Sequence, residues 1–254
     1  MFRLALGSAA VALLSVASYG ATYDFSGATG SGCTANPTAC VYSTGVNNSN
    51  VLLSDGTVDG HYTIIGSPTG SGLGPSSYVV LSNQFPLSTG SWFANDSSSK
   101  WIAPDANQNQ SMPQSDTEAY VYRMTFNLSL LGLSSGSYTI NLGWLSDNRR
   151  NSDSSLLSHI LLNGSAVPSS GNSGESSGGL TPVTINGTYS GGTVNLDFVV
   201  YNLVYTGPGN NPSGLRVNIT SATASDNEGE VPEPATFSLL AAGLIGIGLF
   251  TRRK

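Results

Sequence analysis

Ala-Tyr-Val-Tyr-Arg-Met-Thr-Phe-Asn-Leu, residues 119–128, is the stretch that decides the fold. Every second side chain in it is large and apolar, and most of the side chains between them are polar or β-branched. Successive side chains of a β-strand point to opposite faces, so a period of two predicts a strand with one buried face. We expect that face to consist of Tyr120, Tyr122, Met124, Phe126 and Leu128.

The same period of two recurs along the chain. It predicts further strands at residues 137–144, 193–201 and 215–220. Weaker patterns predict strands at residues 61–65, 78–81, 159–162 and 181–185. The segment between residues 21 and 230 has no convincing helical period. Short strands separated by Gly-, Asn- and Ser-rich turns predict an all-β fold, an antiparallel jelly-roll sandwich.

Both ends of the sequence have the composition of targeting segments. Residues 1–20 combine Arg3 with an apolar stretch and then small residues, a pattern typical of a cleaved signal peptide. An apolar run of 16 residues, 235–250, precedes the basic residues Arg252, Arg253 and Lys254. As a helix this run would be about 24 Å long, which is short for a hydrocarbon core of about 30 Å. The basic residues are expected to stay in the cytoplasm.

Four regions are therefore predicted: a signal peptide (1–20), a β-sandwich ectodomain (21–225), an acidic linker (226–230) and a C-terminal membrane segment (231–254). Residues 21–230 contain 14 acidic and five basic side chains, a net charge of −9. Nucleic-acid binding requires a basic surface. We therefore expect no nucleic-acid partner.

Val231-Pro232-Glu233-Pro234 stands immediately before the apolar run. The Pro-Glu-Pro motif, the apolar segment and the Arg/Lys cluster, in this order, resemble the PEP-CTERM sorting signal of Gram-negative bacteria. The resemblance implies an exported protein that the C-terminal helix first anchors in the inner membrane, with its N-terminus outside. An exosortase-like membrane protease would then process it for the cell surface or the extracellular space. Proteins of this class usually accompany exopolysaccharide production, which makes exopolysaccharide an expected partner.

A second series of motifs runs through the ectodomain in a fixed order. Asp147-Asn148 is followed by Ile160-Leu161-Leu162-Asn163-Gly164 and, later, by Asn211-Pro212-Ser213-Gly214-Leu215-Arg216-Val217. Together with the strand at 120–128, the series resembles the galactose-binding-like jelly roll, over about residues 59–222. That fold serves as a carbohydrate-binding module and as an accessory domain of glycoside hydrolases. Its members differ in ligand, so no ligand residue is transferred from the resemblance.

Carbohydrate binding requires aromatic faces that stack on sugar C–H groups, with amides or carboxylates for the hydroxyls. Trp92 and Trp101 lie in a long connection, residues 83–118, and Asp147 and Asn148 follow a predicted strand. These four are the expected ligand contacts. The tryptophans could instead pack over an open edge of the sandwich. Asp147 and Asn148 could instead satisfy the backbone of a turn.

Cys33 and Cys40 are the two cysteines of the chain, seven positions apart. In an exported protein they are predicted to form a disulfide that closes a small loop. We expect no cofactor. A structural Ca²⁺ would suit an acidic domain, but this ion takes six to eight oxygen ligands, and the sequence has neither an EF-hand pattern nor a dense cluster of aspartates.

Signals for catalysis are weak. Ser97 and Lys100 satisfy a Ser-x-x-Lys pattern, but in a Ser-rich loop without companion motifs. His61 and His159 have no nucleophile elbow or metal-ligand spacing beside them. We therefore expect a non-enzymatic structural or carbohydrate-binding protein. Two alternatives stay open: a secreted sugar-active enzyme with paired carboxylates, and an adhesin or ice-type surface binder with a flat Thr/Ser/Asn face and no pocket.

Overall fold

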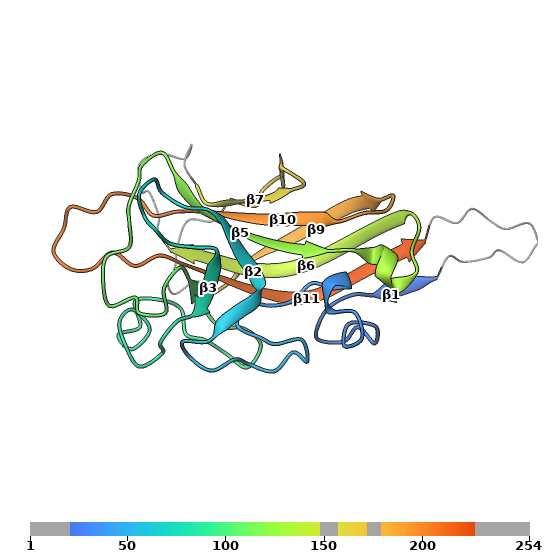
Figure 1. Ribbon diagram of the computed structural model, residues 1–254, viewed down its shortest axis with the longest axis horizontal. Coiled ribbons are helices and arrows are strands. Elements are labelled where there is room, and N and C mark those ends of the chain that lie inside the picture. Colours follow the sequence, from blue (N-terminus) through green and yellow to red (C-terminus); the bar gives the residue numbers. More distant parts are fainter. Residues whose placement is uncertain (1–20, 148–156, 172–178, 227–254) are drawn as a thin grey trace, which may run out of the picture. The chain divides into compact units, whose positions relative to one another are not determined.

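The computed structural model describes residues 21–147, 157–171 and 179–226. Almost all of them belong to one compact unit, Thr22–Asn227. Eleven strands form a single, strongly curled antiparallel sheet, a half-barrel (Figure 1). Within the described ranges the chain forms no α-helix. The prediction of an all-β antiparallel fold is therefore confirmed.

The strands follow one hydrogen-bonded path, in the order β8-β7-β10-β5-β2-β3-β4-β11-β6-β9, with β1 paired to β11. Their bounds are β1 (Thr22–Asp24), β2 (Val58–Gly66), β3 (Ser76–Val79), β4 (Ile102–Ala103), β5 (Ala119–Phe126), β6 (Gly136–Asp147), β7 (His159–Leu162), β8 (Ser165–Ala166), β9 (Thr181–Tyr189), β10 (Val194–Tyr201) and β11 (Gly214–Asp226). Two 3₁₀ turns, η1 (Pro37–Ala39) and η2 (Leu128–Leu131), complete the regular structure.

The curl explains the difference from the predicted two-sheet sandwich. The short strands β3 and β4 join the wall made of β7, β10, β5 and β2 to the wall made of β11, β6 and β9. Tyr78 of β3 pairs with Ala103 of β4, and Ile102 of β4 pairs with Leu215 of β11. The two walls still face each other, because the ring centroids of Trp144 on β6 and Phe198 on β10 are 5.8 Å apart. The result is a sandwich-like core inside one continuous sheet.

The strongest sequence patterns correspond to β5, β6, β10 and β11. Each of these strands turns its predicted apolar face inward. The predicted strand at 119–128 ends at Phe126, because Asn127 accepts a hydrogen bond from the Ser129 N–H and caps η2. The strand predicted at 78–81 lies earlier, at Ser76–Val79. Strands β1, β4 and β8 were not predicted; each has two or three residues, too few to show a period.

Two hydrophobic clusters lie on opposite faces of the β6–β11 pair. The main core fills the inside of the curl and includes Tyr62, Tyr122, Phe126, Trp144, Leu196, Phe198 and Val217. The loop cluster consists of Val80, Trp92, Trp101, Ala103 and Leu145, with Leu87, Phe93 and Leu180 packed against it. On β6, Trp144 points into the main core and its neighbour Leu145 into the loop cluster. The long connection before β5 therefore packs on the outer face of the sheet.

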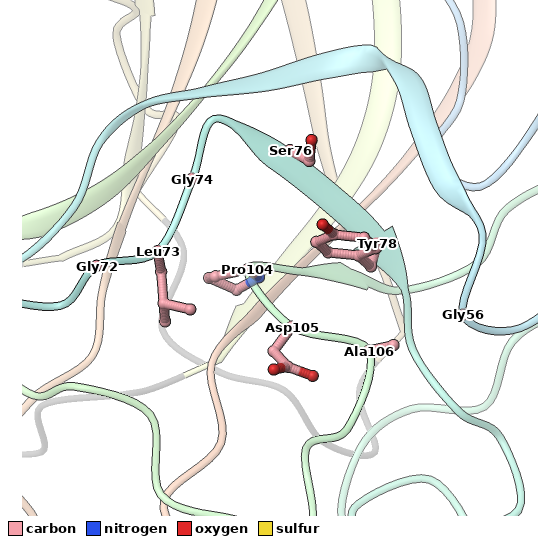
Figure 2. A pocket seen from close by; sticks show the side chains of 9 residues that line it. All are labelled: Gly56, Gly72, Leu73, Gly74, Ser76, Tyr78, Pro104, Asp105 and Ala106. Atoms are coloured by element: carbon pink, nitrogen blue, oxygen red, sulfur yellow. The ribbon is translucent and has the colours of Figure 1, made fainter.

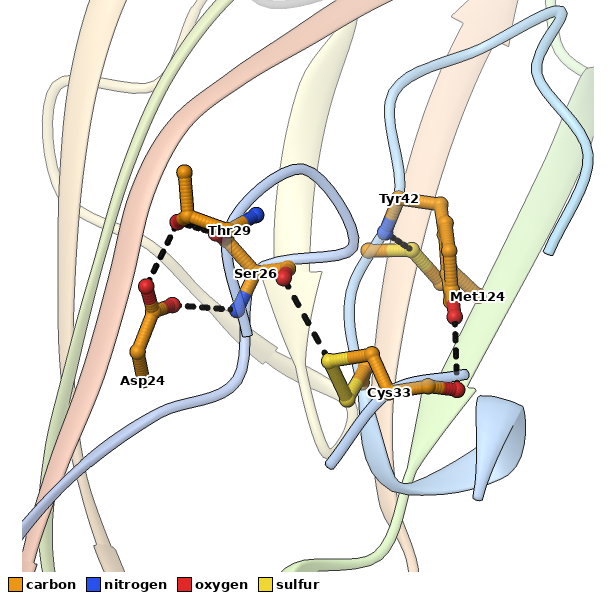
Figure 3. The surroundings of a disulfide bond; sticks show 7 residues. Asp24, Ser26, Thr29, Cys33, Tyr42 and Met124 are labelled. Carbon is orange, nitrogen blue, oxygen red and sulfur yellow. Dashed lines mark hydrogen bonds between the residues drawn. A yellow bond between two sulfur atoms is a disulfide. The ribbon is translucent and has the colours of Figure 1, made fainter. Parts of the chain in front are cut away.

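Cys33 and Cys40 form the predicted disulfide, at an S–S distance of 2.02 Å. The Tyr42 hydroxyl donates to the Cys33 carbonyl at 3.3 Å, and the Tyr42 N–H approaches Met124 Sδ on β5 at 3.3 Å (Figure 3). Nearby, Asp24 accepts hydrogen bonds from the Ser26 N–H and the Thr29 hydroxyl. The disulfide loop is thus attached to the main core through Tyr42.

Candidate functional site

The predicted targeting elements lie outside the described residues. These are the signal peptide (1–20), the sorting motif (231–234), the apolar run (235–250) and the basic residues (252–254), and Asn148 is also outside. In the part of the chain that the structure describes, no helix is long and apolar enough to span a bilayer.

Trp92 and Trp101, two of the expected sugar contacts, are buried. Their rings stack on each other, with centroids 4.3 Å apart and an interplanar angle of 28°. The Trp101 indole N–H donates to the Phe93 carbonyl at 2.8 Å. The structure places both rings inside the loop cluster, on the outer face of the sheet and not over an open edge of a sandwich. Neither ring therefore offers an exposed face on which a sugar could stack.

Arg216 on β11 links the loop that carries the loop cluster to the sheet. Its side chain is fully buried, and its Nη2 lies 2.5 Å from Asp96 Oδ2. Its Nε–H donates to Ser99 Oγ at 2.9 Å, and its Nη1 donates to the Ala94 carbonyl. The guanidinium also lies 5.5 Å from the centre of the Phe93 ring. Burial lowers the pKa of Arg216 and Asp96 opposes that shift, so the residue stays charged and needs its carboxylate partner.

Asp147 and Trp92 come together at a small pocket of about 160 Å³, which we call the Asp147 pocket. Asp147 is the last residue of β6 and is almost fully buried. The other lining residues are Phe85, Pro86, Ser91, Tyr205, Asn210, Asn211 and Pro212. The structure therefore joins two of the four predicted ligand contacts, Trp92 and Asp147, which are 55 positions apart in the sequence.

Tyr205 is an aromatic residue of this pocket that the sequence analysis did not single out. It is 49% exposed, unlike both tryptophans. Its N–H donates to the Gln114 side chain at 2.6 Å, and its hydroxyl donates to the Pro208 carbonyl at 3.1 Å. The signal that could have identified it is an aromatic residue inside a Gly-, Pro- and Asn-rich connection between two strong strands. Loops of this kind carry many binding residues.

Three of the residues considered for catalysis, His61, His159 and Lys100, are engaged in structural contacts. The His61 ring stacks on Tyr42 with centroids 3.8 Å apart. Burial lowers the pKa of His61 to about 4. His159 lies on a different strand, with Nδ1 2.9 Å from the Leu157 carbonyl oxygen. Lys100 Nζ pairs with Asp55 at 3.0 Å, so its ammonium group is directed toward a carboxylate.

Asp59 is the most deeply buried carboxyl group near the main core, with 1% of the residue exposed. Its two oxygens accept hydrogen bonds from the backbone N–H groups of Gly45 (2.7 Å) and His61 (2.9 Å). Burial raises the pKa of Asp59 to about 6, even though these donors favour the charged form. Among the described residues, no three His, Cys, Asp or Glu side chains are placed to hold a metal ion.

Arg123 and Asp197 form a bidentate ion pair. They lie directly opposite each other on β5 and β10. Arg123 Nε and Nη2 each donate to one Asp197 oxygen at 2.7 Å. The pair covers the Asp197 carboxylate: only 5% of its side chain is exposed, against 33% for Arg123. The cross-strand register hides the carboxylate under the longer side chain.

Comparison with known families identifies the C-terminal segment. Residues 230–254 match the family model of the PEP-CTERM protein-sorting motif. No curated protein matches the chain. The chain thus carries a PEP-CTERM motif, as the sequence predicted, and the motif implies an exported, membrane-associated or cell-surface protein that an exosortase processes. The match covers the sorting tail and does not extend into the β-sheet unit.

Proposed function

We propose that this protein is an exosortase-sorted surface or matrix protein whose β-sheet unit binds carbohydrate without catalysing a reaction on it. The observation that carries the sorting part is the match of residues 230–254 to the PEP-CTERM motif. The carbohydrate part rests on the resemblance of the ectodomain to the galactose-binding-like jelly roll, and on the Asp147 pocket. Exopolysaccharide in the surroundings of the cell is the proposed partner.

The chemistry of the tail suits a segment that is recognised and then cut. Proline fixes its own backbone and restricts the residue before it to extended conformations. The two prolines of the motif, Pro232 and Pro234, therefore distinguish it from the apolar run that follows. The apolar residues 235–250 hold the motif at the membrane, and the basic residues keep the tail on the cytoplasmic side.

The sorting proposal is tested by replacing Pro232, Glu233 and Pro234 with alanine in the native host. The expected result is an unprocessed precursor that stays in the membrane fraction, because the protease no longer recognises its motif. A matched control replaces Asn227, Glu228 and Gly229 with alanine, just before the motif, and should be processed normally. Normal processing of the first variant would show that another signal sorts this protein.

The Asp147 pocket supplies the chemistry that carbohydrate binding needs. Tyr205 offers a half-exposed ring for the C–H face of a sugar, and Asn210 and Asp147 line the same hollow with polar groups. Aromatic and apolar walls combined with a few polar groups are typical of small-ligand sites. The structure supports the proposal through this geometry.

The carbohydrate proposal is tested by depletion of the full chain from solution onto polysaccharide beads. Tyr205→Ala should weaken binding by about tenfold, because it removes the exposed aromatic platform. Val51→Ala changes another exposed apolar residue, far from this pocket in the sequence, and should bind like the wild type. Release of new reducing ends from the beads would instead favour the sugar-active enzyme.

A further inference from the structure

A second, larger hollow lies on the sheet where β3 and β4 meet. It measures about 400 Å³, within the size range of small-ligand sites. We call it the Tyr78 pocket. Its side-chain lining consists of Leu73, Ser76, Tyr78, Pro104, Asp105 and Ala106, and the backbone of three glycines completes it (Figure 2).

The alternation of β3 directs Tyr78 into this hollow. Ser77 and Val79 are buried, while Ser76 and Tyr78 point outward and are half-buried. Because Tyr78 pairs with Ala103, its ring lies beside Pro104, the next residue of the chain. Figure 2 shows the Pro104 ring between Leu73 and the Tyr78 ring. The three residues form an apolar wall.

Two polar groups in the same hollow keep unused hydrogen-bonding capacity. Asp105 Oδ1 accepts a hydrogen bond from the Asn107 N–H at 2.8 Å. The other carboxylate oxygen of Asp105 and the Tyr78 hydroxyl have no hydrogen-bond partner among the described residues. Both groups line the pocket, and the Asp105 carboxylate projects beside the apolar wall (Figure 2). A bound molecule could therefore use an apolar face and two polar groups together.

The glycines keep the pocket open. Gly56, Gly72 and Gly74 have φ angles of 79°, 66° and 105°, a backbone conformation that other residues adopt only with strain. A Cβ atom at Gly72 would meet no atom within 4 Å, so the space beside it is free. Gly74 could not take a larger residue as easily, since its Cβ would lie 3.3 Å from Ile64. Gly72 and Gly74 therefore contribute only backbone to the pocket, on either side of the Leu73 side chain.

The charged residues that line the Tyr78 pocket limit the chemical class of ligand that it can bind. Its lining contains one carboxylate and no Lys, Arg or His. An anionic ligand would be repelled, and a purely apolar one would leave the carboxylate without water or a partner. A sugar ring has an apolar C–H face and hydroxyl groups that donate hydrogen bonds. It therefore satisfies both the apolar wall and the polar groups.

We propose that the Tyr78 pocket binds one neutral pyranose residue of a polysaccharide, stacked on the half-buried Tyr78 ring and donating a hydroxyl hydrogen bond to Asp105. This inference rests on the proposed carbohydrate-binding function and places it at a site separate from the Asp147 pocket. The sugar is held by contacts alone, and no bond is made or broken.

The test uses the full chain in a polyoxyethylene detergent, which contains no sugar. Beads of agarose and cross-linked dextran supply neutral polymers, chitosan beads a cationic one and alginate beads an anionic one. Depletion isotherms compare wild type, Tyr78→Ala, Tyr78→Phe, Asp105→Asn and Tyr205→Ala. Tyr78→Phe and Asp105→Asn keep side-chain shape, and circular dichroism melts confirm that each variant is folded.

The expected result is retention on a neutral polymer, with Tyr78→Ala and Asp105→Asn each weakening it by about tenfold. Tyr78→Phe should lose less, because it keeps the ring. Wild-type-like binding of folded Tyr78→Ala and Asp105→Asn would overturn the inference. If Tyr205→Ala loses binding in that case, carbohydrate binding stands as the proposed function, but at the Asp147 pocket and not at the Tyr78 pocket. Preference for chitosan or alginate would overturn the neutral ligand class, and wild type bound to no bead would overturn both proposals.

Discussion

The main core and the loop cluster each have an ionisable side chain buried beside them, and they accommodate it in different ways. Asp59, next to the main core, has a pKa raised to about 6 by burial and can lose its charge by taking up a proton. Arg216, under the loop cluster, cannot lose its charge in this way and is paired with Asp96. The main core therefore depends on apolar packing, and the loop cluster depends on one charged contact.

This difference follows from how each cluster is built. Strands with alternating apolar residues bring the main-core side chains together, and the stability of this core comes from many packed rings. The loop cluster covers the outer face of the sheet at the Arg216–Leu145 pair, with loop residues that have no regular hydrogen-bonding partner strand. Damage to the main core should lower global stability, whereas damage to the ion pair should first loosen the loop.

Phe198→Ala should have the largest effect. The Phe198 ring is fully buried, and its centroid lies 5.8 Å from Trp144 and 6.0 Å from Tyr62. Removing it should lower the free energy of unfolding by about 4 kcal/mol, measured by urea denaturation. Thr188→Ala, on the exposed face of β9, is the control and should change it by less than about 0.5 kcal/mol. Equal effects of the two variants would contradict a sheet-built core.

The pH dependence of stability tests how the buried carboxyl group is accommodated. Burial raises the pKa of Asp59 from 3.8 to about 6. The stability that this shift contributes is therefore fully present below pH 4 and is lost as the pH rises through 6. Burial lowers the pKa of His61 from 6.5 to about 4, so its contribution is present above pH 6.5 and is lost as pH falls through 4. Each pKa shift corresponds to about 3 kcal/mol in the free energy of unfolding. The two shifts change stability in opposite directions as the pH falls.

Single variants should separate the two contributions. Asp59→Asn leaves His61 unopposed, so its free energy of unfolding should fall between pH 6.5 and 4. His61→Gln leaves Asp59 unopposed, so stability should rise over that range as pH falls. Wild type should vary less than either variant in urea titrations at pH 4, 5, 6 and 7. Parallel curves for all three proteins would rule out this pair of shifts.

The ion pair of the loop cluster should give the smallest effect on global stability and a clear local one. Asp96→Asn leaves the buried guanidinium without its carboxylate, and should cost about 2 kcal/mol, reduced from the fully buried case because 45% of the Asp96 side chain is exposed. Arg216→Met removes the buried charge itself and should cost less. Hydrogen exchange over residues 93–100 should accelerate more in Asp96→Asn. A larger loss of stability and faster exchange in Arg216→Met than in Asp96→Asn would show that the packing of the Arg216 side chain matters more than its charge.

The sequence predicted those parts of the fold that repeat locally. The alternation of Tyr120, Tyr122 and Met124 identifies β5 and its buried face without any knowledge of its neighbours. Strand β4 has two residues, and its position depends on pairing with β3 and β11, which no local pattern records. The same holds for Arg216, whose strand position was expected but whose partner Asp96 lies 120 residues earlier.

The candidate sites divide in the same way. The sorting motif is contiguous, so its residues could be identified from the order of Pro232, Glu233 and Pro234 before an apolar run. The pockets are assembled from distant segments. The sequence marks Tyr205 only as an aromatic residue in a Gly-, Pro- and Asn-rich connection, and Tyr78 does not differ locally from an ordinary strand tyrosine. Trp92 and Trp101 have the aromatic faces that sugar binding requires, but the fold uses these faces for packing in the loop cluster.

The most direct test of the central claim is the intact mass of the native protein, purified from its own host with and without the sorting protease. Exosortase processing predicts a product shortened near Val231 and found outside the inner membrane when the protease is present. It also predicts a longer, membrane-bound form when the protease is absent. A full-length C-terminal tail under both conditions would contradict the account and leave residues 231–254 as an ordinary membrane anchor.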